Sequence, residues 1–127
     1  MKNAIIYLVR STSHDIDLLK KSIDLLKSNF INLDKVDILI FHEDSLSPAL
    51  NIISQFHKNI KFQLINFTLP EFYNSFDILE RYPHPFVPGM FFSMGYRHMC
   101  RLFSGEIFKH PLIREYDNYL RLDTDSF

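Results

Sequence analysis

The chain has 127 residues, of which 46% are hydrophobic and 23% charged, with 3 Gly and 6 Pro. This length is typical of one domain, and the composition excludes a disordered or collagen-like chain. A formal net charge of −1 gives no bulk attraction to nucleic acid, and no apolar run is long enough for a membrane segment. The single cysteine, Cys100, excludes an internal disulfide.

The first half of the chain alternates apolar runs with amphipathic segments. Residues 4–9 form a continuous apolar run, which predicts a buried strand. Apolar residues then recur at spacings of three and four, which predicts a helix to Phe30, with Thr12 and Asp15 as a capping box at its start. Residues 36–41 and 60–67 predict two more strands, and Ser47-Pro48 predicts the start of a short helix between them. Strands alternating with helices in this way predict an α/β fold with a mostly parallel sheet.

The second half is less regular. Prolines punctuate residues 68–88, and residues 81–85 predict an exposed loop. Apolar residues from Phe92 to Phe103 then predict a helix that ends before Pro111, with Cys100 in its buried stripe. Residues 119–122 predict a fourth strand, which is followed at once by Asp123-Thr124-Asp125.

Polar residues follow three of the predicted strands, where open α/β sheets bind ligands. They are Arg10 after the first strand, His42-Glu43-Asp44 after the second, and Asp123 with Asp125 after the fourth. Two carboxylates at i and i+2 can converge on one hard divalent cation, which shares its oxygen ligands with substrate phosphates. The alternative is an ordinary solvated pair of surface aspartates.

A second polar group lies on the predicted helix near residue 100. Arg97 and Arg101 are four residues apart, so both emerge on one face, and planar guanidinium groups suit phosphate oxygens. The alternative is a solvated helix face. His98 and His110 could ligate a metal, but we expect them to be hydrogen-bonded or solvated, and we expect Cys100 to be a core residue rather than a nucleophile.

Residues 95–105, with the sequence GYRHMCRLFSG, resemble the Tyr-Arg-x-Met-Cys-Arg-Phe-x-Ser-Gly segment of the fungal α-1,2-mannosyltransferases of glycosyltransferase family 15. The similarity continues through His110-Pro111-Leu112 to Asp123-Thr124-Asp125, which stands where the family has Glu-Pro-Asp. Weaker similarity reaches back to the first strand, the helix after it and the turn at 41–44.

The resemblance implies a Rossmann-like GT-A fold, of which residues 1–127 would be a single nucleotide-sugar-binding half. Family members transfer mannose from GDP-mannose to a hydroxyl of a glycan or glycoprotein acceptor, with retention of configuration and with Mn²⁺ (or Mg²⁺). By position, Asp125 would be a metal ligand, and Asp123 would reach the metal or the ribose. Tyr96 would act catalytically near the donor sugar. The candidates for binding the nucleotide and diphosphate are four arginines: Arg10, Arg97, Arg101 and Arg121.

The sequence also departs from the family pattern. Asp123-Thr124 in place of Glu-Pro returns the motif to the general Asp-x-Asp form, which allows a different donor base or sugar. The resemblance implies a Golgi location, whereas the lack of a signal anchor in the chain leaves the cytoplasm as an alternative. The sequence ends shortly after Asp125, and we expect the chain to be truncated at this point and to be inactive alone.

Two other functions are open at this stage. One is a truncated or inactive transferase-like binding module. The other is a haloacid-dehalogenase-like phosphatase with Asp123 as nucleophile, although in such enzymes the motif normally opens the domain, whereas here an α/β pattern precedes it.

Overall fold

The computed structural model describes residues 1–10, 12–43, 52–55, 57–66 and 94–127. They belong to two units, Met1–Asn66 with Pro111–Phe127, and Phe67–His110, each of which we describe by itself. The predicted helix start at Ser47-Pro48 and the predicted loop at 81–85 lie outside the described residues.

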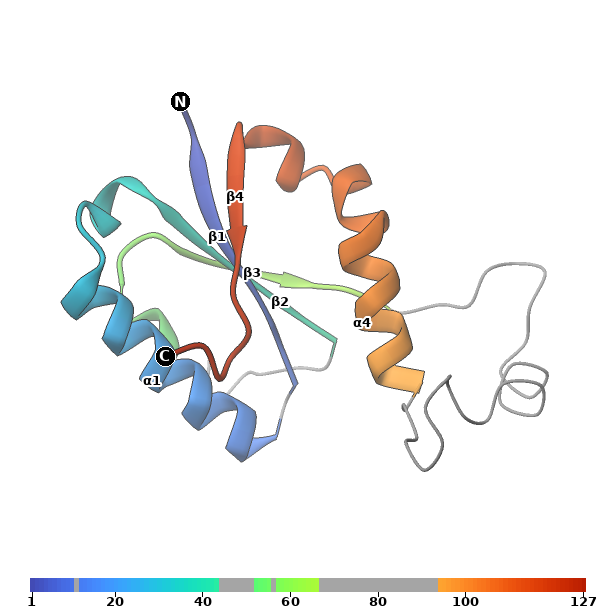
Figure 1. Ribbon diagram of the computed structural model, residues 1–127, viewed down its shortest axis with the longest axis horizontal. Helices are drawn as coiled ribbons and strands as arrows, with labels where there is room; N and C mark the ends of the chain where they lie inside the picture. The colour runs from blue at the N-terminus through green and yellow to red at the C-terminus, as the bar shows by residue number, and fades with distance from the viewer. Residues whose placement is uncertain (11, 44–51, 56, 67–93) are drawn as a thin grey trace. The chain divides into compact units, whose positions relative to one another are not determined.

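The first unit is built on a four-stranded sheet with the order β3-β2-β1-β4 (Figure 1). All three pairings between neighbouring strands are parallel, which confirms the predicted α/β class. The strands are β1 (Asn3–Val9), β2 (Asp37–His42), β3 (Ile60–Leu64) and β4 (Asn118–Arg121). β3 is three residues shorter than predicted, and β4 lies one residue earlier.

Helix α1 (Ser13–Asn29) packs along one face of this sheet. Its apolar residues Leu19 and Ile23 are fully buried against every second residue of β1, namely Ile5, Tyr7 and Val9. On the other face of β1, Ala4 and Ile6 are buried as well and Leu8 is half-buried, so both faces of the strand are covered, as its continuous apolar run predicts. Residues 52–54 are helical within the predicted short helix.

The segment that enters β4 is fixed to the start of β2. The short 3₁₀ helix η3 (Ile113–Glu115) precedes Tyr116, whose hydroxyl donates to Asp37 Oδ2 at 2.5 Å. Lys61 Nζ donates to the same hydroxyl at 3.1 Å and lies 3.3 Å from Asp37 Oδ2. These contacts join β2, β3 and the segment that enters β4, at the end of the sheet where β2 begins, away from its carboxyl edge.

In the second unit, helix α4 (Met94–Ser104) is followed by the 3₁₀ helix η2 (Glu106–Lys109). The helix ends before Pro111, as predicted, but the prediction that Cys100 is a core residue is wrong because its side chain is exposed. Leu102 is buried instead. Positions 100 and 102 differ by about 200° around the helix axis, so the buried side of α4 lies nearly opposite to Cys100. Among the described residues, no helix is long and apolar enough to cross a membrane.

Candidate functional site

The segments that follow β1 and β4 leave neighbouring parallel strands toward the carboxyl edge of the sheet. The chain proceeds from β1 outward through β2 to β3, and β4 then pairs on the opposite side of β1. The strand order therefore reverses at β1, and open α/β sheets bind ligands at such a switch point. Arg10 follows β1, and Asp123 and Asp125 follow β4, so these predicted site residues leave neighbouring strands at one edge.

Arg10 is held in place by Asp15 in the first turn of α1. The Asp15 carboxylate accepts from Arg10 Nε at 2.9 Å, from Nη2 at 3.2 Å and from the backbone N–H at 3.3 Å. Hydrogen bonding from the guanidinium lowers the pKa of the Asp15 carboxyl and raises that of Arg10. Because the Arg10 side chain stays 77% exposed, it is oriented by the protein and remains accessible to an anionic ligand.

The capping box predicted for Thr12 and Asp15 forms in one direction only. The Asp15 N–H donates to Thr12 Oγ1 at 3.3 Å, as a capping hydroxyl requires. In a complete capping box the Asp15 carboxylate would accept a hydrogen bond from the Thr12 backbone N–H. Here the carboxylate accepts from Arg10.

The Asp-x-Asp motif forms a turn rather than an extension of β4. The Ser126 N–H donates to the Asp123 carbonyl at 3.0 Å, and the Asp123 N–H donates to Ser126 Oγ at 3.1 Å. These reciprocal bonds close a four-residue turn, which we call the 123–126 turn. The side chains of Asp123 and Asp125 are both exposed, so the turn presents two carboxylates to solvent.

Arg121, the last residue of β4, lies next to this turn. Its Nη2 is 3.1 Å from Asp123 Oδ1. The guanidinium thus offsets one of the two negative charges of the motif. Both side chains are more than a third exposed, so the pair itself adds little to stability.

The donor set of the turn fits a hard divalent cation. Such ions are commonly held by one or two carboxylates, while water and substrate phosphates supply the other ligands. Among the described residues, no group of three or more His, Cys, Asp and Glu side chains could hold a metal. Burial lowers the pKa of His110 and favours the neutral ring, which is the form that can bind a metal.

The remaining predicted site residues lie on α4 in the second unit. Tyr96, Arg97 and Arg101 are within two turns of one another on this helix. Arg101 Nη2 is 3.6 Å from Glu106 Oε1, which is also 3.6 Å from Lys109 Nζ. The end of α4 and η2 thus carry two cations around one carboxylate, with Arg97 one turn earlier.

Three residues that contact site groups are not among the site residues predicted from the sequence. Asp15 holds Arg10, although its position after Thr12 indicated only a cap. Ser126 closes the turn, and Ser22 of α1 donates to the Ser126 carbonyl at 2.9 Å. Ser22 and Ser126 are 104 residues apart, and no local pattern in the sequence relates them.

Fold and site together define an α/β protein with a basic residue and an Asp-x-Asp turn at the switch point of a parallel sheet. The family described as Glycolipid 2-alpha-mannosyltransferase matches the chain over residues 1–126, and the chain belongs to this family. This confirms the resemblance seen in the sequence and does not favour the phosphatase alternative.

Individual relatives are mannosyltransferases of fungi. "Probable mannosyltransferase KTR3" of Saccharomyces cerevisiae is 58% identical over 33 residues, which cover 26% of this chain and 8% of that protein. "O-glycoside alpha-1,2-mannosyltransferase omh1" of Schizosaccharomyces pombe is 23% identical over 124 residues, which cover 92% of this chain and 32% of that protein.

Solved structures of mannosyltransferases share the fold. Ktr4p of S. cerevisiae superposes with a TM-score of 0.76 at 19% identity, over 98% of this chain and 32% of Ktr4p. Core-mannan synthase A (CmsA/Ktr4) of Aspergillus fumigatus, in its Mn/GDP form, also superposes with a TM-score of 0.76 at 19% identity. This match covers 98% of this chain and 35% of CmsA. The chain therefore spans about a third of the length of the proteins that it matches along most of its own length.

Proposed function

We propose that this chain forms the nucleotide-sugar-binding part of a metal-dependent, retaining α-1,2-mannosyltransferase. The observation that carries the proposal is the family match over residues 1–126, in which the 123–126 turn follows β4 at the switch point of the sheet. The proposed donor is GDP-mannose, and the proposed acceptor is a hydroxyl of a glycan or glycoprotein. CmsA, which has the same fold, is known in a Mn/GDP form, and this supports the choice of metal and nucleotide. A Golgi location is proposed with it, on the resemblance to the family.

In this proposal the 123–126 turn holds Mn²⁺ or Mg²⁺ against the donor diphosphate. Asp125 is the principal ligand, and Asp123 reaches the metal or the ribose while Arg121 offsets part of its charge. A bound divalent ion stabilises the negative charge that develops on the departing nucleoside diphosphate. The exposure of both carboxylates leaves them accessible to the ion and its phosphate ligands.

The arginines and Tyr96 supply the rest of the proposed donor site. Arg10, oriented by Asp15, presents a fixed cation at the carboxyl end of β1. Arg97 and Arg101 of α4 are the other candidates for contacts with the diphosphate, since guanidinium groups match phosphate oxygens. Tyr96, next to Arg97, is proposed to position the donor sugar.

The test is calorimetric titration of the protein with GDP, in Mn²⁺ and in EDTA. We expect saturable GDP binding that requires Mn²⁺ and is lost in Asp125→Asn. Asp17→Asn, at an exposed position of α1, is the matched control and should bind as the wild type does. Failure of the folded wild-type protein to bind either Mn²⁺ or GDP would overturn the proposal.

Incubation with GDP-mannose and a mannoside then tests for catalysis. We expect the 127-residue chain to bind Mn²⁺ and GDP but to transfer no sugar alone. Measurable transfer would exclude an inactive binding module and would contradict the expectation that the chain is inactive alone. UDP and ADP as competitors test the donor base, because Asp123-Thr124 departs from the Glu-Pro of the family.

A further inference from the structure

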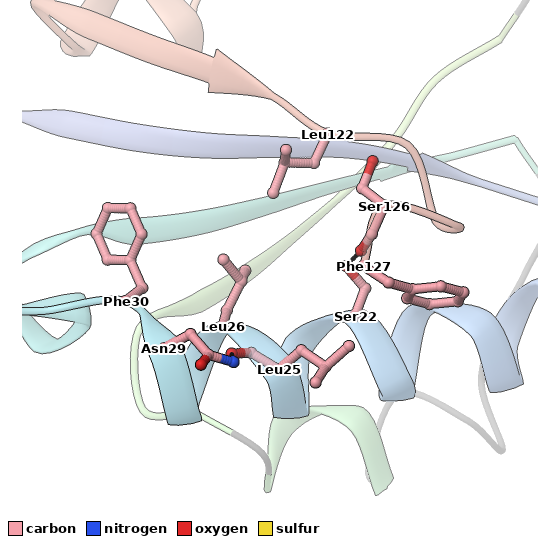
Figure 2. A pocket seen from close by; sticks show the side chains of 8 residues that line it. All are labelled: Ser22, Leu25, Leu26, Asn29, Phe30, Leu122, Ser126 and Phe127. Carbon is pink, nitrogen blue, oxygen red and sulfur yellow. Dashed lines mark hydrogen bonds between the residues drawn. The ribbon is translucent and has the colours of Figure 1, made fainter.

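A chain of hydrogen bonds links the 123–126 turn to the core of the first unit. Figure 2 shows Ser22 on α1 facing Ser126, with Ser22 Oγ donating to the Ser126 carbonyl at 2.9 Å. Ser22 Oγ lies 2.6 Å from the hydroxyl of Tyr7 on β1. Tyr7 and Ser22 are 0% and 1% exposed, so the link begins in the buried core of the first unit and ends at the motif.

The direction of these bonds follows from the number of protons. A serine hydroxyl has one proton to donate, and that of Ser22 is directed to the Ser126 carbonyl, which can only accept. The bond between Tyr7 and Ser22 must therefore run from the phenol to Ser22 Oγ. Burial raises the pKa of the Tyr7 phenol, which keeps that proton in place near neutral pH.

Ser126 uses each of its polar groups to fix the turn. Its Oγ and its N–H bond to the backbone of Asp123 within the turn, while its carbonyl bonds to Ser22 outside it. The first two bonds set the shape of the turn. The third sets where the turn lies on α1, and Lys21 Nζ, 4.3 Å from the centre of the Phe127 ring, adds a contact on the same helix.

We propose that Tyr7 and Ser22 are positioning residues of the metal–diphosphate site, which hold the 123–126 turn so that the Asp123 and Asp125 carboxylates are preorganised for the cation. This inference rests on the proposed function. Exposed carboxylates on an unanchored turn would have to be ordered by the ion itself, at a cost in affinity. Because the turn is anchored to buried groups of β1 and α1, it is ordered when the protein folds, and the ion does not have to order it on binding.

The test compares Mn²⁺ affinity in the presence of GDP among three variants, with free Mn²⁺ measured by electron paramagnetic resonance. Ser22→Ala removes both bonds of Ser22, and we expect the affinity to fall about fivefold to tenfold, the effect of about one net hydrogen bond. Tyr7→Phe removes only the phenol oxygen and should give a smaller loss in the same direction. Ser28→Ala is the matched control, since the Ser28 hydroxyl donates to the Asp24 carbonyl within α1, and the Mn²⁺ affinity of this variant should not change.

A second readout separates positioning from general destabilisation. In Ser22→Ala, the amide protons of Asp123 and Ser126 should exchange with solvent faster, while those of β1 keep their protection. Ser22→Thr retains the hydroxyl and should restore the affinity; Ser22 lines a groove of about 340 Å³ (Figure 2).

The possible results are distinct. Wild-type protein that binds no Mn²⁺ overturns the proposed function and this inference with it. Wild-type binding that both Ser22→Ala and Tyr7→Phe leave within about twofold overturns the inference alone, because one lost hydrogen bond should exceed that change. If Ser22→Ala does not fold, Tyr7→Phe and the amide exchange at Asp123 decide the matter.

Discussion

Replacement of Asp15 by Asn tests how Arg10 is oriented. The Asp15 carboxylate accepts three hydrogen bonds, from Arg10 Nε, Nη2 and the backbone N–H, at 2.9, 3.2 and 3.3 Å. It is nearly buried at the amino end of α1, where a negative charge is favoured. Asn keeps one acceptor oxygen and the shape of the side chain but loses the charge.

The size of the effect can be estimated from these contacts. The guanidinium is 77% exposed, which limits the pair to about 0.2–1 kcal/mol. The loss of one hydrogen-bond acceptor costs about 0.5–1.5 kcal/mol, and the charge at the helix terminus about 0.3–1 kcal/mol. We therefore expect Asp15→Asn to lower the free energy of unfolding by about 1–2 kcal/mol at pH 7, since such contributions overlap.

The pH dependence of this difference has a definite sign. The pKa of the Asp15 carboxyl is lower in the folded state than its ordinary value. Its contribution is therefore fully present above the unfolded pKa of about 3.9 and is lost as the pH falls through the folded pKa. The stability of the wild type should approach that of Asp15→Asn as the pH decreases below about 4.

Urea unfolding from pH 7 to pH 2.5, followed by circular dichroism, measures both effects. Asp17→Asn, which removes an exposed carboxylate from the same helix, should change stability by less than about 0.5 kcal/mol. Equal stabilities of wild type and Asp15→Asn at pH 7, or a difference that grows on acidification, would refute the reasoning.

Three further predictions concern other parts of the chain. Ile23→Ala should lower the free energy of unfolding by about 2–5 kcal/mol because Ile23 is fully buried, whereas Lys27→Ala at an exposed position of α1 should change it little; equal urea midpoints would contradict the packing of α1. Tyr116→Phe should cost about 1–2 kcal/mol in the same assay by removing the hydroxyl shared by Asp37 and Lys61, and an unchanged midpoint would show that this cluster does not fix β4. Cys100 is exposed, so it should react with a chromogenic disulfide reagent in the native protein as fast as in urea, and strong native protection would contradict its placement.

The sequence predicts the parts of the fold that depend on local patterns. The apolar run of β1 predicts a strand covered on both faces, and the spacing from Ile16 to Phe30 predicts α1, because burial of an apolar face dictates both. Cys100 shows where this reasoning fails, since the apolar stripe of α4 includes more positions than the helix buries and Leu102 occupies the buried side.

The candidate site is predicted less completely. Asp123 and Asp125 follow β4 as expected, because a strand followed by carboxylates is visible in the sequence. The turn that presents them depends on Ser126 and on its bond to Ser22, which is 104 residues away in the chain. Such contacts arise only when the sheet places β4 beside β1 and brings the following segment over α1.

The coupling between Mn²⁺ and GDP tests the central claim most directly. If the 123–126 turn and the diphosphate share one cation, GDP must raise the affinity for Mn²⁺ by the same factor by which Mn²⁺ raises the affinity for GDP. We predict this reciprocal gain in the wild-type protein and its loss in Asp125→Asn with the fold intact. GDP binding of equal strength in Mn²⁺ and in EDTA, or full coupling in Asp125→Asn, would contradict the assignment of this turn as the metal–diphosphate site.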